Sequence, residues 1–346
     1  MVHRRFVSRT IALFLGISLV SGFFVSHTLT VSAQAGFPSA SAGASRKVTV
    51  SPQYPKAFQD VTVTVEDYSQ NIDTATISWS LNGKQVARGT GIKSYSFKTG
   101  FLGSVSTLTV SVNGSSETIA IRPSDIDLVW QSDSYVPPFY EGKALRGNQS
   151  GVRVVAQPFF LTSQGTRLDP ANLLYTWKQN GKVAQASSGL GKQTFFVAPS
   201  VLAKPVDIEV EVSTRTGDYK SVARTTIEEV KPEVILYEDS PLYGVQTQAS
   251  LNGRIFDLGV QPETTLLAVP FFFSTTDGNN QITYSWSQNG ASINKKDNTV
   301  VFRAPTSGAG EARVNVSTKH TTNFMQGGNA SVTVRFDKTQ APASGL

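Results

Sequence analysis

Few residues in this sequence have the types and spacing that catalysis requires. The chain contains three histidines and no cysteine. His3 and His27 lie close to the N-terminus, so a Ser-His-Asp triad in the remaining chain would have to use His320. We interpret the surrounding Thr318–Asn323 as a solvated loop or strand end. The absence of cysteine excludes disulfides, thiolate metal sites and cysteine nucleophiles.

Paired carboxylates are the other candidates for acid and base catalysis. Three adjacent pairs occur, at Glu66-Asp67, Glu228-Glu229 and Glu238-Asp239. Neighbours on a strand point to opposite faces, so these pairs are poor catalytic dyads, and we interpret Glu228-Glu229 as part of a solvated linker. Asp133 and Asp239 occupy matching turns, where they either hold a Ca²⁺ between domains or simply form the turns. We predict no cofactor and no enzymatic activity.

The N-terminus resembles a targeting segment. Three arginines precede Ile11–Val25, a run of fifteen residues without charge, and Ala33-Gln34-Ala35 follows as a small-x-small site. This order predicts a secretory signal peptide at 1–35, cleaved after Ala35, or alternatively an uncleaved N-terminal membrane anchor helix. Either version places the rest of the chain outside the cytoplasm, in the secreted fraction or the cell envelope.

Composition gives no sign of a nucleic-acid partner. The formal net charge is +6, but residues 1–35 carry three arginines and no acid, so cleavage would leave +3 and no basic cluster. The segment 36–46 is small and polar and predicts a flexible linker, and 339–346 predicts a disordered tail. A membrane would be contacted only through an uncleaved N-terminal segment.

The rest of the sequence repeats three times. Trp79, Trp177 and Trp286 each lie in a short apolar run and are each followed by Asn-Gly three residues later. The tryptophans are 98 and 109 residues apart, which is the length of a small domain. We therefore predict domains at 47–123, 124–231 and 232–338.

The local pattern within each repeat is that of β-strands. Apolar and polar residues alternate with period two, which places one face of a strand in a core and the other in water. The clearest runs are Asp60–Glu66, Ser106–Val112, Val206–Val212 and Ser331–Phe336. Asn-Gly favours a two-residue hairpin turn, because both residues tolerate positive φ. The pattern predicts an all-β chain of two-sheet sandwiches.

We predict that the three tryptophans are structural core residues and not ligand platforms. Each is flanked by residues suited to the outer face of a strand, and an indole buries 150–250 Å² between two sheets. Domains of about 100 residues can rely on such a core without disulfides.

The combination of strand-Trp-x-x-Asn-Gly, a Phe-x-Ala-Pro strand and an alternating Val-rich strand resembles bacterial Ig-like domains of the PKD-like type. Repeats two and three carry these motifs best, as Phe196-Val-Ala-Pro199 and Phe302-Arg-Ala-Pro305. The plan is also similar to uncharacterised secreted and envelope proteins of reduced-genome bacteria. The resemblance implies three tandem Ig-like β-sandwich domains after the N-terminal segment, and no known chemistry.

One aromatic and proline-rich cluster opens each of repeats two and three. We expect these rings either to pack the junction between consecutive domains or to form a platform that binds sugar or a partner. The candidate residues are Trp130, Tyr135, Phe139 and Tyr140 in repeat two, matched by Tyr237 and Tyr243 in repeat three.

Three functions fit the sequence. The first is a non-catalytic exported surface protein for adhesion, scaffolding or envelope assembly. The second is binding of carbohydrate or cell-wall polymer through the aromatic clusters, and the third is an accessory subunit of a pilus or secretion machine. The expected partner is therefore a protein or a cell-surface glycan of unknown identity.

Overall fold

The computed structural model describes residues 46–202, 204–276, 278 and 281–339. The expected signal peptide or anchor at 1–35, most of the linker 36–46 and most of the tail 339–346 lie outside these residues. Within them the regular secondary structure is almost entirely β-strand, with two 3₁₀ turns at Pro170–Asn172 and Gln185–Ser187. None of the described helical turns is long and apolar enough to span a bilayer.

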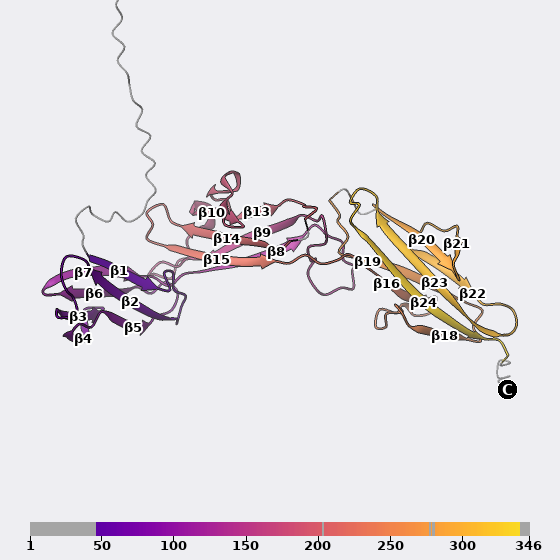
Figure 1. Cartoon of the computed structure of the whole chain (residues 1–346), viewed down its shortest axis with the longest axis horizontal. Coiled ribbons are helices and arrows are strands. Elements are labelled where there is room, and N and C mark those ends of the chain that lie inside the picture. Colours follow the sequence, from indigo (N-terminus) through magenta and orange to yellow (C-terminus); the bar gives the residue numbers. More distant parts are fainter. Residues whose placement is uncertain (1–45, 203, 277, 279–280, 340–346) are drawn as a thin grey trace, which may run out of the picture. The chain divides into compact units, whose positions relative to one another are not determined.

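The strands form three β-sandwiches in chain order, each made of two sheets around its own apolar core (Figure 1). This agrees with the all-β, tandem Ig-like fold expected from the repeats. Domain 1 pairs the order β1-β2-β5 with β4-β3-β6-β7. Its strands are β1 (Arg46–Ser51), β2 (Asp60–Asp67), β3 (Thr76–Leu81), β4 (Lys84–Thr90), β5 (Ser94–Lys98), β6 (Ser106–Val112) and β7 (Ser115–Ile121).

Domain 2 repeats this plan. One sheet has the order β13-β9-β8, and the other has the order β11-β10-β14-β15 with β12 also paired to β10. Its strands are β8 (Asp125–Ser132), β9 (Val152–Phe159), β10 (Leu174–Gln179), β11 (Lys182–Val183), β12 (Gly189–Leu190), β13 (Thr194–Val197), β14 (Val206–Ser213) and β15 (Lys220–Ile227).

Domain 3 has the orders β17-β16-β19-β22 and β18-β24-β23-β20-β21, in which β18 runs parallel to β24. Its strands are β16 (Glu233–Ser240), β17 (Gly244–Val245), β18 (Ile255–Gly259), β19 (Glu263–Phe271), β20 (Ile282–Gln288), β21 (Ala291–Ile293), β22 (Thr299–Arg303), β23 (Ala309–His320) and β24 (Gly327–Asp337).

The three Asn-Gly turns that follow the core tryptophans adopt the conformation that their residues predict. Asn82, Asn180 and Asn289 have φ of 51°, 49° and 49°, and the following glycines are also positive. Each asparagine also exchanges two hydrogen bonds with the start of the next long strand, through its backbone N–H and its side-chain oxygen. The side-chain oxygens accept from Thr107 N (2.9 Å), Asp207 N (2.9 Å) and Arg313 N (2.8 Å). The asparagine therefore ties its hairpin to the neighbouring strand as well as forming the turn.

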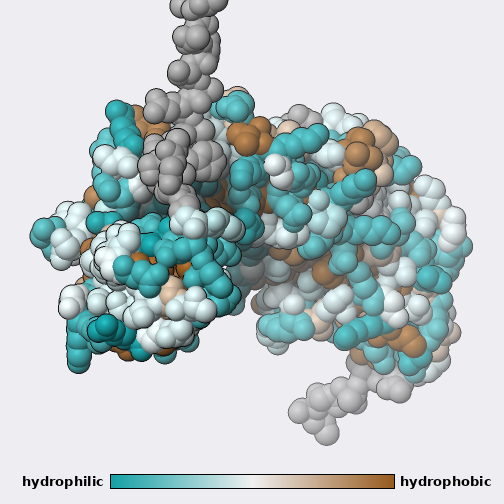
Figure 2. All heavy atoms as spheres, turned by 60° about the vertical axis from the view of Figure 1, so that its left-hand side comes forward, coloured by the Kyte–Doolittle hydropathy of each residue, from teal (hydrophilic) through white to brown (hydrophobic). Residues whose placement is uncertain are grey.

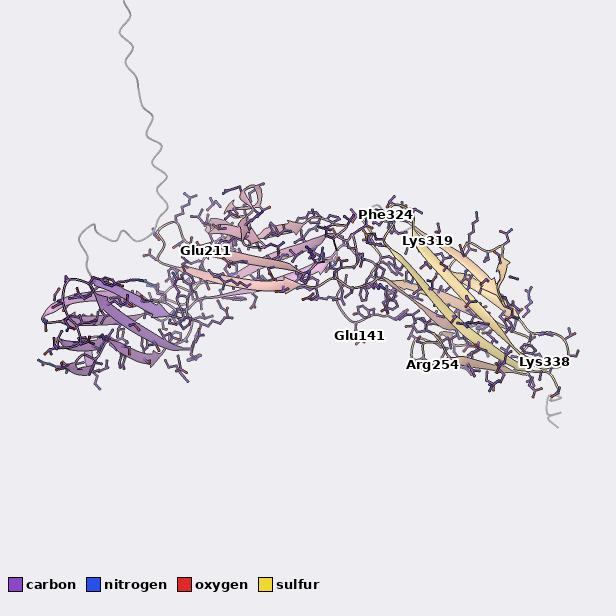
Figure 3. The ribbon with its side chains drawn as sticks, in the orientation of Figure 1. Glu141, Glu211, Arg254, Lys319, Phe324 and Lys338 are labelled. Atoms are coloured by element: carbon purple, nitrogen blue, oxygen red, sulfur yellow. The ribbon has the colours of Figure 1, made fainter. Side chains whose placement is uncertain are left out.

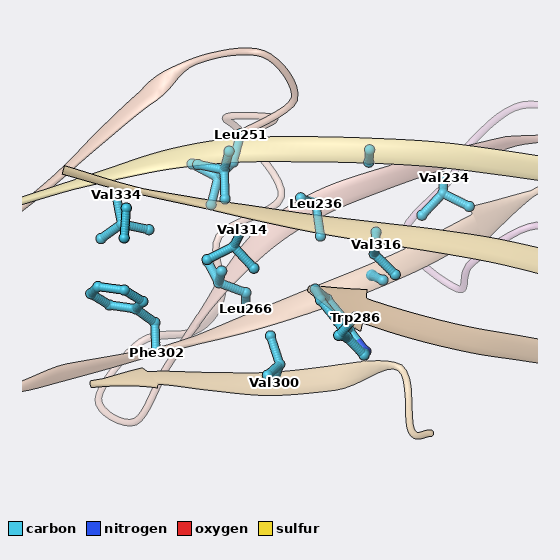
Figure 4. Packing of buried hydrophobic residues seen from close by; sticks show 14 of the residues in the cluster. Val234, Leu236, Leu251, Leu266, Trp286, Val300, Phe302, Val314, Val316 and Val334 are labelled. Atoms are coloured by element: carbon cyan, nitrogen blue, oxygen red, sulfur yellow. The ribbon is translucent and has the colours of Figure 1, made fainter. Parts of the chain in front are cut away.

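The three tryptophans lie at the centres of the three cores, as expected. Trp79 and Trp177 are 0% exposed and Trp286 is 1% exposed. Each indole N–H donates to a backbone carbonyl, of Ile92 (2.9 Å), Lys192 (2.7 Å) and Asp297 (2.9 Å) respectively. The polar atom of each ring is thus satisfied where it is buried. Figure 4 shows Trp286 among the aliphatic side chains of domain 3, including Val300 and Val316.

Candidate interaction site at the junction of domains 2 and 3

Domain 2 reaches domain 3 through the residues between β8 and β9, Asp133–Ser150, which we call the junction segment. Its first residues pair with the chain that follows β19, through an antiparallel bridge between Ser134 and Ser274. The hydrogen bonds run from Tyr135 N to Phe273 O (2.7 Å), from Phe272 N to Tyr135 O (2.7 Å) and from Thr275 N to Asp133 O (3.0 Å). Such pairing fixes register between the two domains.

Aromatic side chains of the junction segment cover the outer face of the domain 3 sheet. The ring of Phe139 lies 5.7 Å from that of Tyr237, edge to face, and 6.4 Å from that of Phe271. The ring of Tyr140 lies 5.7 Å from Phe271 and 5.9 Å from Phe272. Tyr237 and Phe271 are each 6% exposed. The five rings come from three segments that are far apart in sequence, and all but Phe139 belong to one small apolar cluster.

The pairing register corrects one match made from the sequence. In the structure Trp130 corresponds to Glu238, and Tyr237 corresponds to Val129, so matching Trp130 with Tyr237 was wrong by one residue. The shift follows from the strand pairs, in which Ile126 lies opposite Pro158 and Val234 lies opposite Pro270. One residue along a strand changes the face of the sheet.

The two aromatic residues consequently have different roles. Trp130 packs against the core of domain 2, and Nζ of Lys143 lies 3.2 Å from the centre of its ring. Desolvation lowers the pKa of Lys143. Tyr237 faces outward, where it is covered by the junction segment, whereas Val129 at the equivalent position of domain 2 is 52% exposed.

A buried amide joins the same two domains. Gln326, in the loop between β23 and β24, is 1% exposed. Its Oε1 accepts from Ser274 N (2.8 Å), and its Nε2 donates to the carbonyl of Asn148 in the junction segment. Beside it, Met325 N donates to Oε1 of Gln149 (3.0 Å). The loop and the junction segment, marked by Phe324 and Glu141 in Figure 3, therefore exchange hydrogen bonds.

An ion pair within domain 2 lies where the chain leaves that domain towards domain 3. The side chains of Arg146 and Glu229 are 1% and 8% exposed, and Nη2 of Arg146 lies 3.5 Å from Oε2 of Glu229. Arg146 also donates from Nη1 to the carbonyl of Lys204 (2.9 Å) and accepts from Val230 N (2.8 Å). Burial raises the pKa of Glu229, and the guanidinium of Arg146 opposes that rise. The prediction that Glu228-Glu229 is simply a solvated linker was wrong for Glu229.

At this junction two backbone segments lie so close together that residue 147 has no room for a side chain. A Cβ on Gly147 would lie 1.9 Å from the carbonyl oxygen of Phe272. Two residues of the contact, Gln149 and Phe272, have positive φ (55° and 63°), a conformation that non-glycine residues adopt rarely. The contact therefore holds backbone conformations that the local sequence does not favour.

His320 is buried beside the same contact, so its interpretation as a solvated loop residue was wrong. It is 4% exposed, and its Nε2 lies 3.1 Å from the carbonyl of Ser274. Backbone N–H groups of Thr322 (3.2 Å) and Asn323 (3.0 Å) donate to its Nδ1. In these contacts Nδ1 is the acceptor, and Nε2 faces a carbonyl oxygen. Both ring nitrogens thus contact backbone groups, and these contacts order the loop that carries Gln326.

The structure does not bring all the predicted site residues together. Tyr135, Phe139, Tyr140 and Tyr237 meet at the junction, whereas Tyr243 is 80% exposed on the hairpin between β16 and β17. Asp133 lies at the end of domain 3 that contacts domain 2, and Asp239 pairs with Val245 at the other end. These two aspartates are thus separated, and among the described residues no cluster of three or more carboxylates and imidazoles could hold a metal.

The junction of domains 1 and 2 is built differently. Lys56 and Asp125 form an ion pair (2.8 Å) whose side chains are 62% and 30% exposed. Ser124 N donates to the carbonyl of Pro55 (3.1 Å) and Ser124 Oγ to that of Lys220 (3.1 Å). The turns at this junction carry Phe58 and Phe101, which are 66% and 64% exposed. Nζ of Lys220 also lies 5.6 Å from the centre of the Tyr54 ring. Ser124 is buried (1% exposed), whereas the ion pair and the two phenylalanines are accessible to water.

Comparison with known proteins gives similarity of fold only. No family model matches the chain, and no curated protein matches it. The three N-terminal domains of the bacteriophage RB49 outer capsid protein Hoc align over 85% of this chain and 98% of their own, at 12% identity and a TM-score of 0.26. The central fibronectin-III array of RIM-binding protein aligns over 84% and 95%, at 11% identity and a TM-score of 0.29.

Sidekick-1 immunoglobulin domains 1–4 align over 82% of this chain and 71% of that one, at 8% identity and a TM-score of 0.19. Scores of this size carry no argument by themselves. The class of the protein rests on its own sheets and cores, which define a tandem array of Ig-like β-sandwich domains.

Proposed function

We propose that this chain is a non-catalytic, exported scaffolding module in which domains 2 and 3 act as one stiff unit. The observation that carries the proposal is the junction between them. Backbone pairing, a cluster of aromatic rings and a buried amide all join the two domains. A tandem array needs such coupling when it must hold its ends at a fixed spacing.

The placement of the aromatic residues supports scaffolding over sugar binding. A sugar platform needs several rings exposed on one face, and Tyr237 and Phe271 are instead buried by the junction. Phe139 is 40% exposed, and its ring already packs against Tyr237 and Phe271. The surface of Figure 2 is largely hydrophilic, with apolar residues scattered over it.

Export is part of the proposal and rests on the N-terminal sequence. The arginines, the uncharged run Ile11–Val25 and the small residues at Ala33 and Ala35 are the features that support it. A role in adhesion or envelope assembly would follow from an extracytoplasmic location.

Two measurements on the full chain test this function. Protease treatment of intact cells that produce the protein should degrade domains 1 to 3, and crosslinking on those cells should recover the chain bound to another envelope component. Binding of the purified full chain to a glycan array and to peptidoglycan tests the carbohydrate alternative.

The proposal expects protease sensitivity on intact cells, a crosslinked protein partner and no specific glycan signal. A chain protected inside intact cells would refute export. A glycan signal that Tyr243→Ala abolishes, with Phe324→Ser as a control on an exposed aromatic elsewhere, would replace scaffolding by carbohydrate binding.

A further inference from the structure

We propose that domain 3 binds an extended acidic peptide of a partner protein, as a strand added along the free edge of β20. This edge is residues 282–285, which we call the open edge. The proposal goes beyond the scaffolding role, because a stiff pair of domains can hold its ends apart without taking up a peptide here.

The same edge is closed in the other two domains. In domain 1, β4 pairs with β3 along the whole of that strand. In domain 2, β11 pairs with residues 178–179 at the end of β10, and β12 pairs with residues 174–175 at its start. In domain 3, β21 pairs with β20 only at residues 286–288, and no described strand pairs with the rest of that side.

The difference comes from the chain that follows the hairpin. In domain 2, residues 184–193 connect β11 to β13 and form β12 on the way. In domain 3, residues 294–298 connect β21 to β22, and this shorter connection, all of it described, contains no strand that could cover β20. The tyrosines two residues before the core tryptophans show the result. Tyr175 is 1% exposed, whereas Tyr284 is only partly buried.

Backbone groups of the open edge are directed away from β23. The N–H of Asn289 and the carbonyl of Gln281 both bond to the β23 side, at 2.9 and 2.8 Å, so odd-numbered residues of β20 face β23. Successive residues of an antiparallel strand alternate in direction, so Ile282 and Tyr284 direct their N–H and C=O groups to the open side. Such a row is a template for an incoming strand.

Two adjoining hollows follow the open edge. The first, of about 520 Å³, is lined by the open edge and by residues 292–296. The second, of about 460 Å³, shares Ile282 and Tyr284 with the first and extends to Pro270 and to Tyr135 of the junction segment. An added strand would therefore find room for its backbone and for a side chain beside it.

The second hollow favours an apolar side chain. Ile282 and Tyr284 pack against the core of domain 3. Burial raises the pKa of Tyr284 to about 12, and Tyr135 adds to the rise, so a charged group is disfavoured here. Residues opposite each other on paired strands point to the same face, so the peptide residue opposite Tyr284 would enter this hollow. We expect that residue to be apolar.

Charge determines the residues that flank the apolar one. Lys295 and Lys296 both line the first hollow, and both are exposed. Lys295 pairs with Asp297, which leaves Lys296 without an ion pair among the described residues. Acidic residues on either side of the apolar one would complement this positive charge.

The occupant is a segment of another protein. Residues 1–45 and 340–346 of this chain, which lie outside the described residues, contain no aspartate or glutamate. A second copy that paired its own β20 in the same way would bring the lysines at 295 and 296 of both copies together, which like-charge repulsion disfavours. An extended acidic segment of a partner protein meets the requirements of both shape and charge.

Fluorescence anisotropy of labelled synthetic peptides, titrated with the full chain, tests this site. In the probe peptides Glu alternates with Val, Leu, Phe or Tyr, and the matched control peptides carry Lys in place of Glu. The site variant is Lys295→Glu with Lys296→Glu. The control variant is Lys182→Glu with Lys192→Glu, two exposed lysines of domain 2. Thermal unfolding of each variant verifies that its fold is retained.

Glu peptides should bind, and Lys peptides should bind about tenfold more weakly. The site variant, Lys295→Glu with Lys296→Glu, should invert this preference, and the control variant should keep it. Hydrogen exchange followed by NMR gives a second readout. The amides of Ile282 and Tyr284 should exchange quickly in the free chain and slowly with bound peptide, while that of Tyr175, paired with β12, should stay slow throughout.

Failure of every Glu peptide to bind would overturn the proposal. So would equal weakening by the control variant, or binding that leaves the exchange of Tyr284 unchanged, since either result would place the peptide elsewhere. Protection of Tyr284 by self-association, without peptide, would make a second copy the occupant and would also overturn it. None of these results bears on export or on the coupling of domains 2 and 3, which are measured separately.

Discussion

The two junctions of this array join the same kinds of domain with different chemistry. Between domains 2 and 3, Gln326 is 1% exposed and Tyr237 is 6% exposed. Between domains 1 and 2, the ion pair of Lys56 and Asp125 is open to water. Breaking a polar contact costs more free energy when it is buried, because the group that remains loses its partner and cannot form a hydrogen bond to water instead. Domains 2 and 3 should therefore move and unfold together, and domain 1 should not.

The difference also explains the outer surface of the domain 3 sheet. An exposed sheet face is expected to be polar, yet the face that carries Tyr237, Val269 and Phe271 is apolar. The equivalent face of domain 2 carries Val129 and Gln157, which remain exposed. Among the described residues this apolar face packs against Tyr140 of the junction segment and Val245 of β17, so its composition follows in part from the junction.

The largest expected effect comes from removing a core tryptophan on either side of the comparison. Trp286→Ala should cost roughly 3–5 kcal/mol. Because domains 2 and 3 should unfold together, calorimetry should show their joint transition moving to a lower temperature. Trp79→Ala should lower the transition of domain 1 alone. A shift of all three domains in Trp79→Ala would contradict the difference between the junctions.

Breaking the buried ion pair should cost nearly as much. Arg146→Met leaves Glu229 buried without its counter-charge, a change worth about 3–5 kcal/mol in comparable sites. Chemical denaturation measures it, and Arg335→Met is the matched control. Arg335 pairs with Glu311 in an exposed ion pair (side chains 49% and 47% exposed), so its loss should cost about 0–1 kcal/mol.

The cost of Arg146→Met should depend on pH with a definite sign. The pKa of Glu229 is raised in the folded chain, above its ordinary value of 4.5, so the folded state binds the proton more readily than the unfolded state. Stability should therefore recover as pH falls through the raised pKa towards 4.5. A cost that grows on acidification over this range would show that Glu229 is not the group responsible.

Gly147→Ala tests the close backbone approach at the same junction. The added Cβ would lie 1.9 Å from the carbonyl of Phe272, so both backbones must shift. Overpacking of this kind costs about 1–3 kcal/mol, and we expect the joint transition of domains 2 and 3 to separate into two. Gly103→Ala at the other junction meets Thr162 O at 2.7 Å and carries a φ of +90°. It should destabilise domain 1 without splitting any transition.

The smallest effect belongs to the exposed ion pair of the junction between domains 1 and 2. Lys56→Met should change the free energy of unfolding by about 0–1 kcal/mol, because both side chains are hydrated before and after. Urea denaturation with and without added salt measures it. A cost of several kcal/mol would place domain 1 in the same cooperative unit as the others.

The sequence predicted the fold through signals that are local. Runs of period two predicted β2, β6, β14 and β24, and Asn-Gly pairs predicted the hairpins. Both signals are local, because turn conformation and strand alternation depend on neighbouring residues. The burial of the three tryptophans followed from their mid-strand position. The register error at Trp130 arose because two aromatic residues looked equivalent, while the strand pairing that sets the register is not local.

The junction was predictable only in part for the same reason. Aromatic and proline residues at the start of repeats two and three indicated the segment that forms the junction. They did not determine which rings the neighbouring domain would cover. Gln326, Arg146, Gly147 and His320 carry no local signature, since their partners lie on other elements of the fold. Gln326, for example, meets Asn148 far along the chain.

The most direct test of the account uses the absence of native cysteine, which permits clean spin labelling at introduced cysteines. Double electron–electron resonance would compare the exposed pair Lys182→Cys with Ala291→Cys across domains 2 and 3, and Ala120→Cys with Lys182→Cys across domains 1 and 2. The account predicts a narrow distance distribution for domains 2 and 3, broadened by Gly147→Ala, and a wide distribution for domains 1 and 2. Equal widths for both pairs would contradict it.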